Sequence, residues 1–125
     1  MTVPGPIRVL IADDHKLVRR GLVSICERKG GFEIVGEAEN GRQAVALAGQ
    51  LKPDVIIMDI RMPELDGIAA TAQIMEANPA ARVIMLTMHG DDRHVFAAIQ
   101  AGAQGYFLKN SDDLQVVDGV RSVYL

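Results

Sequence analysis

The sequence predicts an α/β fold built on one doubly wound parallel sheet of five strands, with helices on both faces. The first observation is alternation: five short apolar runs are each followed by a segment with helical periodicity, which is the pattern of repeated βα units. The second is that three of the runs are apolar throughout, like strands buried on both faces. The third is a length of 125 residues without a linker, repeat or low-complexity tract, which favours one domain.

The strands are expected, in chain order, where β-branched and other apolar residues cluster. VLIA, VIIM and VIML, in the first, third and fourth strands, are continuously apolar. The second run carries Glu33 and Glu37, and the fifth is interrupted by Gln104 and Gly105, so these two are expected at the edges of the sheet. The expected strands cover residues 7–12, 32–37, 55–58, 82–86 and 104–108.

The helices are expected where apolar residues recur every three or four positions. Asn40, Asp91 and Ser111 are the expected N-caps of the second, fourth and fifth helices, because each has a short side chain that can accept a free backbone N–H. Pro53 and Pro79 break the chain after the second and third helices. The expected helices cover residues 15–28, 41–51, 65–77 and 92–101, with a last one from about 112 onward.

Right-handed crossovers and the burial of the strands favour the strand order 2-1-3-4-5. Polar residues stand directly after four of the strands: Asp13 and Asp14, Asp59, Thr87 and Lys109. The carboxyl ends of parallel strands share one edge, where open α/β sheets bind their ligands. In this order the second strand is added on one side of the first strand and the third on the other. The three aspartates are therefore expected to meet at the carboxyl ends of the first and third strands.

Three neighbouring carboxylates repel one another unless a cation compensates. Such an oxygen-rich site favours Mg²⁺, with Mn²⁺ as a substitute, and an aspartate beside a bound cation can accept a phosphoryl group. Lys109 would supply a charge and Thr87 a hydroxyl for the transferred oxygens. The plainer alternative, that strand-end aspartates only cap helices, explains one aspartate but not the whole set.

Charge and composition exclude several functions. A net charge of −3 and a pI of about 5.5 provide no basic face for DNA or RNA. No apolar run approaches the roughly 18 residues that span a bilayer, and the expected location is the cytoplasm. Cys26 is the single cysteine, so no disulfide can form within the chain. Its place on an apolar helical stripe predicts a buried thiol.

Four segments, IADDHKLVRRGL, VIIMDIRMPELDGI, VIMLTMHGDD and AGAQGYFLKN, resemble the ordered signatures of the receiver domains of two-component response regulators. The resemblance covers essentially the whole chain, residues 1–125, and implies a flavodoxin-like sheet. It implies that Asp59 is the phosphoacceptor and that Asp13 and Asp14 hold the metal ion with Asp59 and the main-chain carbonyl of Arg61.

The same resemblance implies that Thr87 and Lys109 contact the phosphoryl group, and that Thr87 and Tyr106 form the switch. A cognate sensor histidine kinase would be the phosphoryl donor. The chain would not be an enzyme beyond self-catalysed phosphotransfer and autodephosphorylation. Asn110 stands where proline is common after the lysine, and a cis peptide before asparagine costs about 2.5 to 4 kcal/mol. Met88 stands where many relatives have a small residue.

DDH, LTMHGDD and GYFLK resemble the NarL/FixJ class, whose receivers precede a C-terminal LuxR-type helix-turn-helix. We expect such a DNA-binding domain outside these 125 residues. The expected output is dimerisation, through the first and fifth helices, with the basic pair Arg19 and Arg20 on the first, or through the fourth helix, fifth strand and fifth helix.

Three alternatives remain open at the level of the sequence. One is a stand-alone receiver that acts through protein–protein contacts. A magnesium-dependent aspartyl-phosphate phosphatase is disfavoured because Arg61 stands where such enzymes need a second carboxylate. A flavodoxin-like cofactor module is disfavoured because the first loop, Asp13-Asp14-His15-Lys16, lacks the Ser, Thr and Gly donors that cradle a phosphate.

Overall fold

A computed structural model describes residues 5–88, 92–109 and 111–125. Its sheet has the order β2-β1-β3-β4-β5, and every neighbouring pair is parallel, which confirms the predicted topology. The strands are β1 (Ile7–Ala12), β2 (Phe32–Ala38), β3 (Val55–Asp59), β4 (Val83–Thr87) and β5 (Gly105–Leu108).

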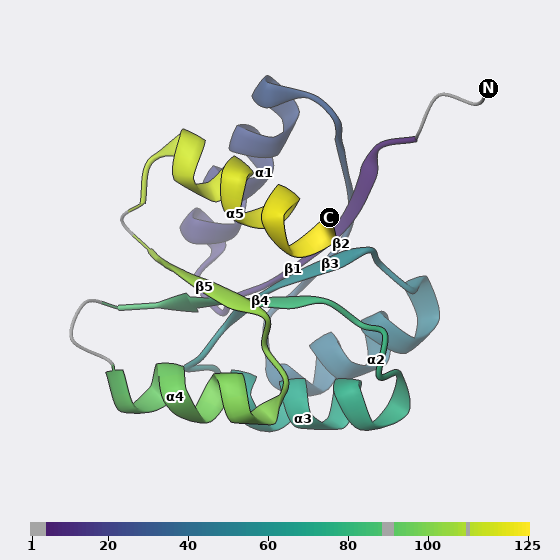
Figure 1. Cartoon of the computed structure of the whole chain (residues 1–125), viewed down its shortest axis with the longest axis vertical. Helices are drawn as coiled ribbons and strands as arrows, with labels where there is room; N and C mark the ends of the chain where they lie inside the picture. Colours follow the sequence, from purple (N-terminus) through teal and green to yellow (C-terminus); the bar gives the residue numbers. More distant parts are fainter. Residues whose placement is uncertain (1–4, 89–91, 110) are drawn as a thin grey trace.

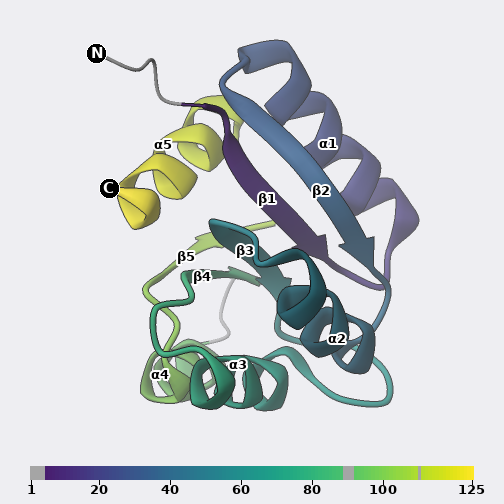
Figure 2. The ribbon, with the colours of Figure 1, turned by 90° about the vertical axis from the view of Figure 1, so that its right-hand side faces the viewer.

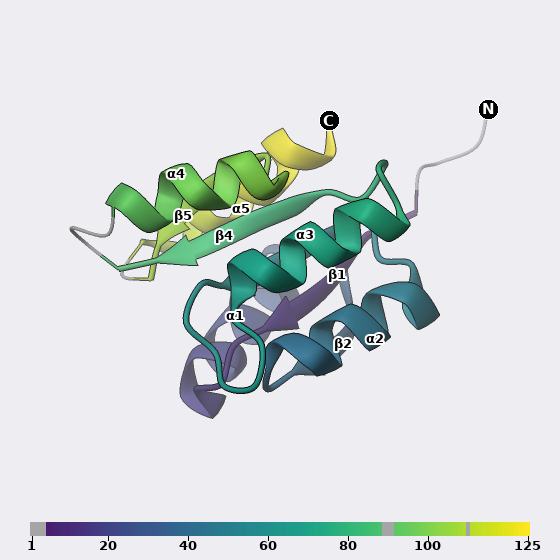
Figure 3. The same cartoon turned by 90° about the horizontal axis from the view of Figure 1, so that it is seen from below.

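The helices form a layer on each side of the sheet. They are α1 (Lys16–Lys29), α2 (Gly41–Leu51), α3 (Gly67–Ala77), α4 (Asp92–Ala101) and α5 (Asp113–Tyr124). Figure 1 shows α1 and α5 on one face and α2, α3 and α4 on the other, and Figures 2 and 3 show the same layers from the side and from below. No helix in the described part of the chain is long and apolar enough to cross a membrane.

The core has two halves because successive strand residues point to opposite faces. In β1, Val9 and Ile11 pack in the cluster that includes α1 and α5 residues, whereas Leu10 and Ala12 belong to the cluster on the α2–α4 side. All residues of β3 and β4 are buried, as predicted for central strands. Cys26 lies on the buried side of α1 with 1% of its surface exposed, and burial raises the pKa of its thiol to about 11.

Helix starts differ in places from the sequence-based expectation. Asn40 caps α2 as predicted, since its Oδ1 accepts a 2.8 Å hydrogen bond from the Gln43 backbone N–H. The prediction of Ser111 as the α5 cap is wrong, because Asp112 holds that place in a reciprocal capping box. The predicted cap Asp91, together with His89 and the Lys109–Asn110 peptide, lies outside the described residues.

The start of α3 packs directly on the end of β3. Asp66 caps this helix, and the next residue, Gly67, donates its N–H to the Ile60 carbonyl at 2.7 Å. A Cβ on Gly67 would lie 1.9 Å from the main-chain oxygen of Asp59. Only glycine therefore lets the start of α3 come this close to the main chain of Asp59. This contact holds the end of β3, where Asp59 stands, in place.

Candidate functional site

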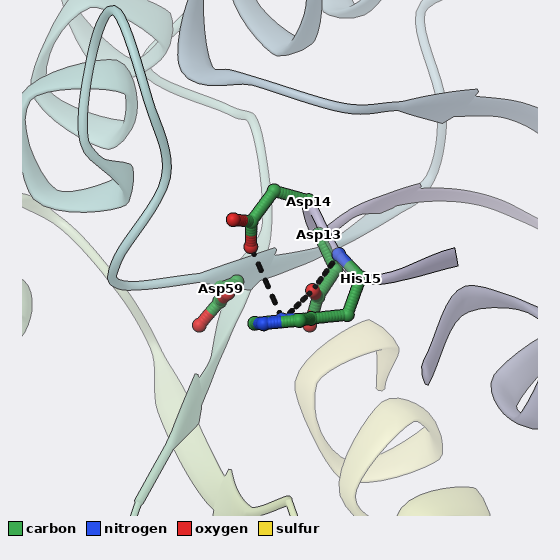
Figure 4. Close-up of side chains that lie close together, drawn as sticks. All are labelled: Asp13, Asp14, His15 and Asp59. Carbon is green, nitrogen blue, oxygen red and sulfur yellow. Dashed lines mark hydrogen bonds and ion pairs between the residues drawn. The ribbon is translucent and has the colours of Figure 1, made fainter. Parts of the chain in front are cut away.

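The carboxyl edge of the sheet brings together side chains from the ends of β1 and β3. Asp13, Asp14 and His15 follow β1, and Asp59 is the last residue of β3. Each offers a potential ligand atom, and these atoms all lie within 4.8 Å of one another. Figure 4 shows the four side chains lying close together at the sheet edge. Asp13 and Asp59 are buried, while Asp14 and His15 reach solvent.

Lys109 bridges two of these carboxylates from the end of β5. Its Nζ lies 3.0 Å from Oδ2 of Asp59 and 3.2 Å from Oδ2 of Asp13, and its backbone N–H donates to the Thr87 carbonyl at 3.0 Å. Burial lowers the pKa of Lys109, but the hydrogen bond and charge of Asp59, with the charge of Asp13, outweigh it, so the pKa is raised overall. The lysine is therefore a firmly protonated cation at the site.

Asp59 has an unusual ionisation despite this cation. Burial, followed by the negative charge of Asp13, raises the pKa of Asp59 from 3.8 to about 6, although Lys109 and the Arg61 backbone N–H oppose the rise. One lysine therefore compensates the cluster only in part. A further positive charge near Asp59 would stabilise the ionised carboxylate.

The two oxygens of Asp13 have different surroundings. Oδ1 accepts a 2.7 Å hydrogen bond from the His15 backbone N–H and lies 3.0 Å from His15 Nδ1. Oδ2 is buried beside the Lys109 ammonium, but it accepts no hydrogen bond from any residue that the structure describes. A buried carboxylate oxygen that has an ionic contact but no hydrogen bond, in an oxygen-rich cluster, fits a hard divalent cation.

The remaining predicted residues lie around this cluster. Thr87 is buried at the end of β4, and its hydroxyl donates to the Met88 carbonyl at 3.3 Å. Arg61, Thr87 and the exposed Met88 line one pocket with Asp59 and His15. Tyr106 stands apart on β5, with 53% of its surface exposed.

Two residues near the site, His15 and Arg19, have contacts that the sequence analysis did not predict. His15 turns its Nδ1 toward the carboxylates of Asp13 and Asp14, at 3.0 and 3.2 Å, instead of capping α1. Arg19 was expected with Arg20 as a basic pair beside a dimerisation surface of the first helix, but its side chain is buried. The sequence does contain a signal for this burial: Arg19, Leu22 and Cys26 are spaced by three and four residues and so lie on one face of the helix.

Comparison with known proteins agrees with this architecture. A family model of the response regulator receiver domain matches residues 9–121. The response regulator protein VraR of Staphylococcus aureus is 42% identical over 115 residues, which cover 92% of this chain and 55% of VraR. The chain thus spans about half the length of the curated relatives it matches.

Solved structures show the same fold. The receiver domain of the putative response regulator NarL from Mycobacterium tuberculosis is 36% identical with a TM-score of 0.88, and the match covers 92% of this chain and 93% of that one. A chain of the CheX–CheY–BeF3–Mg²⁺ complex of Borrelia burgdorferi is 33% identical with a TM-score of 0.90, over 97% and 91% of the two chains. The chain therefore belongs to the response regulator receiver family, and within it to the class of NarL.

Proposed function

We propose that this chain is a phosphorylation-dependent switch that receives a phosphoryl group on Asp59 from a sensor histidine kinase. The observation that carries the proposal is the setting of Asp59. Its carboxylate is buried at a strand end, contacts the Lys109 ammonium at 3.0 Å, and lines a pocket shared with Thr87. A carboxylate that lines a pocket beside a lysine ammonium is suited, when ionised, to nucleophilic attack on phosphorus.

In the proposed transfer, an Asp59 oxygen attacks the phosphorus of a phosphohistidine. The P–N bond of the donor breaks as the P–O bond of the acyl phosphate forms. Lys109 pairs with the transferred oxygens, which carry more charge than the carboxylate it now contacts. Release of the phosphoryl group to water would be slow self-catalysed hydrolysis, so the chain would not act as an enzyme on other substrates.

A divalent cation fits the site through Asp13, Asp14, Asp59 and the main-chain carbonyl of Arg61. Mg²⁺, for which Mn²⁺ is a substitute, would neutralise the oxygens of the entering phosphoryl group. The buried Oδ2 of Asp13, which contacts Lys109 but accepts no hydrogen bond from a described residue, and the raised pKa of Asp59 support this assignment. The similar CheX–CheY complex was crystallised with BeF3, a phosphoryl analogue, and Mg²⁺.

The proposed switch uses Thr87 and Tyr106. Among the residues that the structure describes, the Thr87 hydroxyl has a single hydrogen bond, 3.3 Å long, to the next residue, so it can turn toward a phosphoryl oxygen at small cost. Tyr106 is half exposed on the neighbouring strand and would take up the space that Thr87 leaves. Its movement would remodel the surface of α4, β5 and α5.

The output is proposed to be altered dimerisation, through that surface or through α1 and α5, coupled to a DNA-binding domain. The chain covers only 55% of VraR, and a LuxR-type helix-turn-helix in the rest of the protein would supply the DNA contacts that this acidic domain does not. The surface on α1 is smaller than expected, because Arg19 and Leu22 are buried.

The decisive experiment is incubation with acetyl phosphate and Mg²⁺, followed by intact mass measurement. We expect a gain of one phosphoryl group that is absent from Asp59→Asn and from a sample with EDTA. Lys109→Met should remain folded and take up the group more slowly. A gain that persists in Asp59→Asn, or no gain in a folded wild-type protein, would refute the proposed acceptor.

A further inference from the structure

Arg19 is a buried cation close to the acidic site. It lies one turn into α1, with 6% of its surface exposed, on the same face as the buried Leu22 and Cys26. A guanidinium at such a position is costly unless its donors are satisfied. Its partners therefore indicate why a cation occupies a core position.

The guanidinium joins three segments. Nη1 donates a 2.6 Å hydrogen bond to the main-chain carbonyl of Asp13, and Nε donates to Oε1 of Glu37 at 3.1 Å. Nη2 lies 3.6 Å from Oε1 of Glu39 in the loop after β2. The planar fork thus reaches the β1–α1 loop on one side and the carboxylates from the β2 end on the other, which a lysine ammonium cannot match.

The bond to Asp13 acts on the peptide unit that links the two neighbouring aspartates. The carbonyl of Asp13 and the N–H of Asp14 share one plane, so holding this carbonyl fixes the direction in which Asp14 leaves the strand. The N–H of Asp13 is held as well, by the Ala38 carbonyl at 3.0 Å. Both sides of Asp13 are therefore fixed to neighbouring elements.

We infer that Arg19 is a positioning residue for the divalent-cation site. By holding the Asp13 carbonyl, it keeps the Asp13 and Asp14 carboxylates directed toward Asp59, and it thereby sets the affinity of the cluster for Mg²⁺. Glu37 and Glu39 orient the guanidinium and balance its charge. The inference rests on the proposed function only in requiring that the cluster binds a divalent cation.

The sign of the effect separates positioning from simple electrostatics. Arg19 is positive, so removing its charge would by Coulomb attraction alone strengthen the binding of a cation to the nearby carboxylates. Positioning predicts the opposite, because a released Asp13–Asp14 peptide no longer presents its ligands together. Loss of an outer partner of a metal ligand typically weakens metal binding by about 10- to 100-fold.

The test measures Mg²⁺ binding by isothermal titration calorimetry for wild type, Arg19→Met and Arg19→Lys, with folding checked by circular dichroism. Arg8→Met is the matched control, because Arg8 also donates to main-chain carbonyls, those of Leu51 and Lys52, but from the opposite end of β1. We expect Arg19→Met to bind at least about tenfold more weakly, Arg19→Lys to bind with intermediate affinity, and Arg8→Met to bind like wild type despite a lower melting temperature.

Unchanged or tighter binding in folded Arg19→Met would overturn the inference, as would equal weakening in Arg8→Met or no Mg²⁺ binding by wild type. If Arg19→Met does not fold, Arg19→Lys decides alone, and wild-type affinity in it overturns the positioning role. The titration needs no phosphoryl donor. A wild-type protein that binds Mg²⁺ but gains no mass from acetyl phosphate would therefore refute the proposed function while leaving the role of Arg19 to the titration.

Discussion

Replacing Asp59 with asparagine should stabilise the metal-free protein at neutral pH. Burial and the charge of Asp13 raise the pKa of this carboxyl to about 6, so the folded state holds the proton more tightly than the unfolded chain. The sign follows from linkage: the contribution of this group to stability is fully present below about pH 4 and is lost as the pH rises through about 6. At pH 7 the folded protein therefore contains an ionised group that its surroundings disfavour.

The size of the effect follows from the shift. A rise from 3.8 to about 6 is about two pK units, each equivalent to about 1.4 kcal/mol. Asparagine keeps the shape without the charge, and Lys109 keeps Asp13 as a partner at 3.2 Å. We expect a gain of about 2 to 3 kcal/mol at pH 7 without metal, which corresponds to roughly 6 to 12 °C in melting temperature.

Urea denaturation followed by circular dichroism at pH 4, 5, 6 and 7 in EDTA measures this gain. The gain should shrink toward zero at pH 4, where Asp59 is protonated in the folded wild type. It should also shrink in Mg²⁺ at pH 7, because the cation stabilises the wild type more than the variant. Asp118→Asn, which removes an exposed carboxylate from α5, controls for net charge. A less stable Asp59→Asn at pH 7, or a gain that does not change with pH, would refute the reasoning.

Three further substitutions or modifications test the packing around the site. Gly67→Ala should lower stability by about 1 to 3 kcal/mol, because it overpacks the β3 end, and should slow phosphoryl uptake. Gly49→Ala has nothing within 4 Å of the new methyl group and should stabilise α2 by about 0.5 to 1 kcal/mol. Equal effects of the two substitutions on urea denaturation would contradict this contrast. Asp112→Ala should lower stability by about 0.5 to 2 kcal/mol and Ser111→Ala should change it little, and the reverse order would mean that the capping box is wrongly assigned. The Cys26 thiol, buried and with a pKa of about 11, should react with a disulfide reagent at pH 8 only after unfolding, so rapid labelling of the native protein would count against a packed α1.

The strand order was predictable because a strand that is buried on both faces is apolar at every position. VLIA, VIIM and VIML are apolar at every position, and the structure pairs these strands in the centre of the sheet. The ends were less accurate, because main-chain pairing continues past the last apolar side chain. Asp59 pairs with Leu86, and Thr87 with Leu108. Both polar residues therefore belong to the strands that the prediction placed just before them.

The helix starts show a similar limit. Ser111 and Asp112 are adjacent and both suit an N-cap, so residue type alone could not distinguish them. The spacing to Gln115 could, because a capping box needs a Glu or Gln three residues after the cap. In α3, Leu65 extended the apolar pattern before Asp66, and the prediction began the helix two residues early.

The convergence of Asp13, Asp14, Asp59 and Lys109 was predictable from topology, because residues at the carboxyl ends of parallel strands must share one edge. The contacts of Arg19 were not. A charged residue on a helix is usually exposed, and its partners, Glu37 and Glu39, stand about 20 positions away in the chain. Their proximity depends on the side-by-side placement of β1 and β2, and on side-chain geometry that no spacing rule supplies.

The two sides of the site differ in how firmly they are held. On the β1 side, Asp13 is fixed by the short hydrogen bonds from Arg19 and from the His15 backbone, at 2.6 and 2.7 Å. On the β4–β5 side, the Thr87 hydroxyl has one hydrogen bond of 3.3 Å to a described residue, while the Lys109 ammonium contacts both Asp13 and Asp59. A phosphoryl group on Asp59 would therefore meet fixed ligands on one side and a movable hydroxyl donor, that of Thr87, on the other. Because the Lys109 backbone N–H donates to the Thr87 carbonyl, the proposed shift of Thr87 would act on β5 as well as β4, while the metal-binding loop kept its geometry.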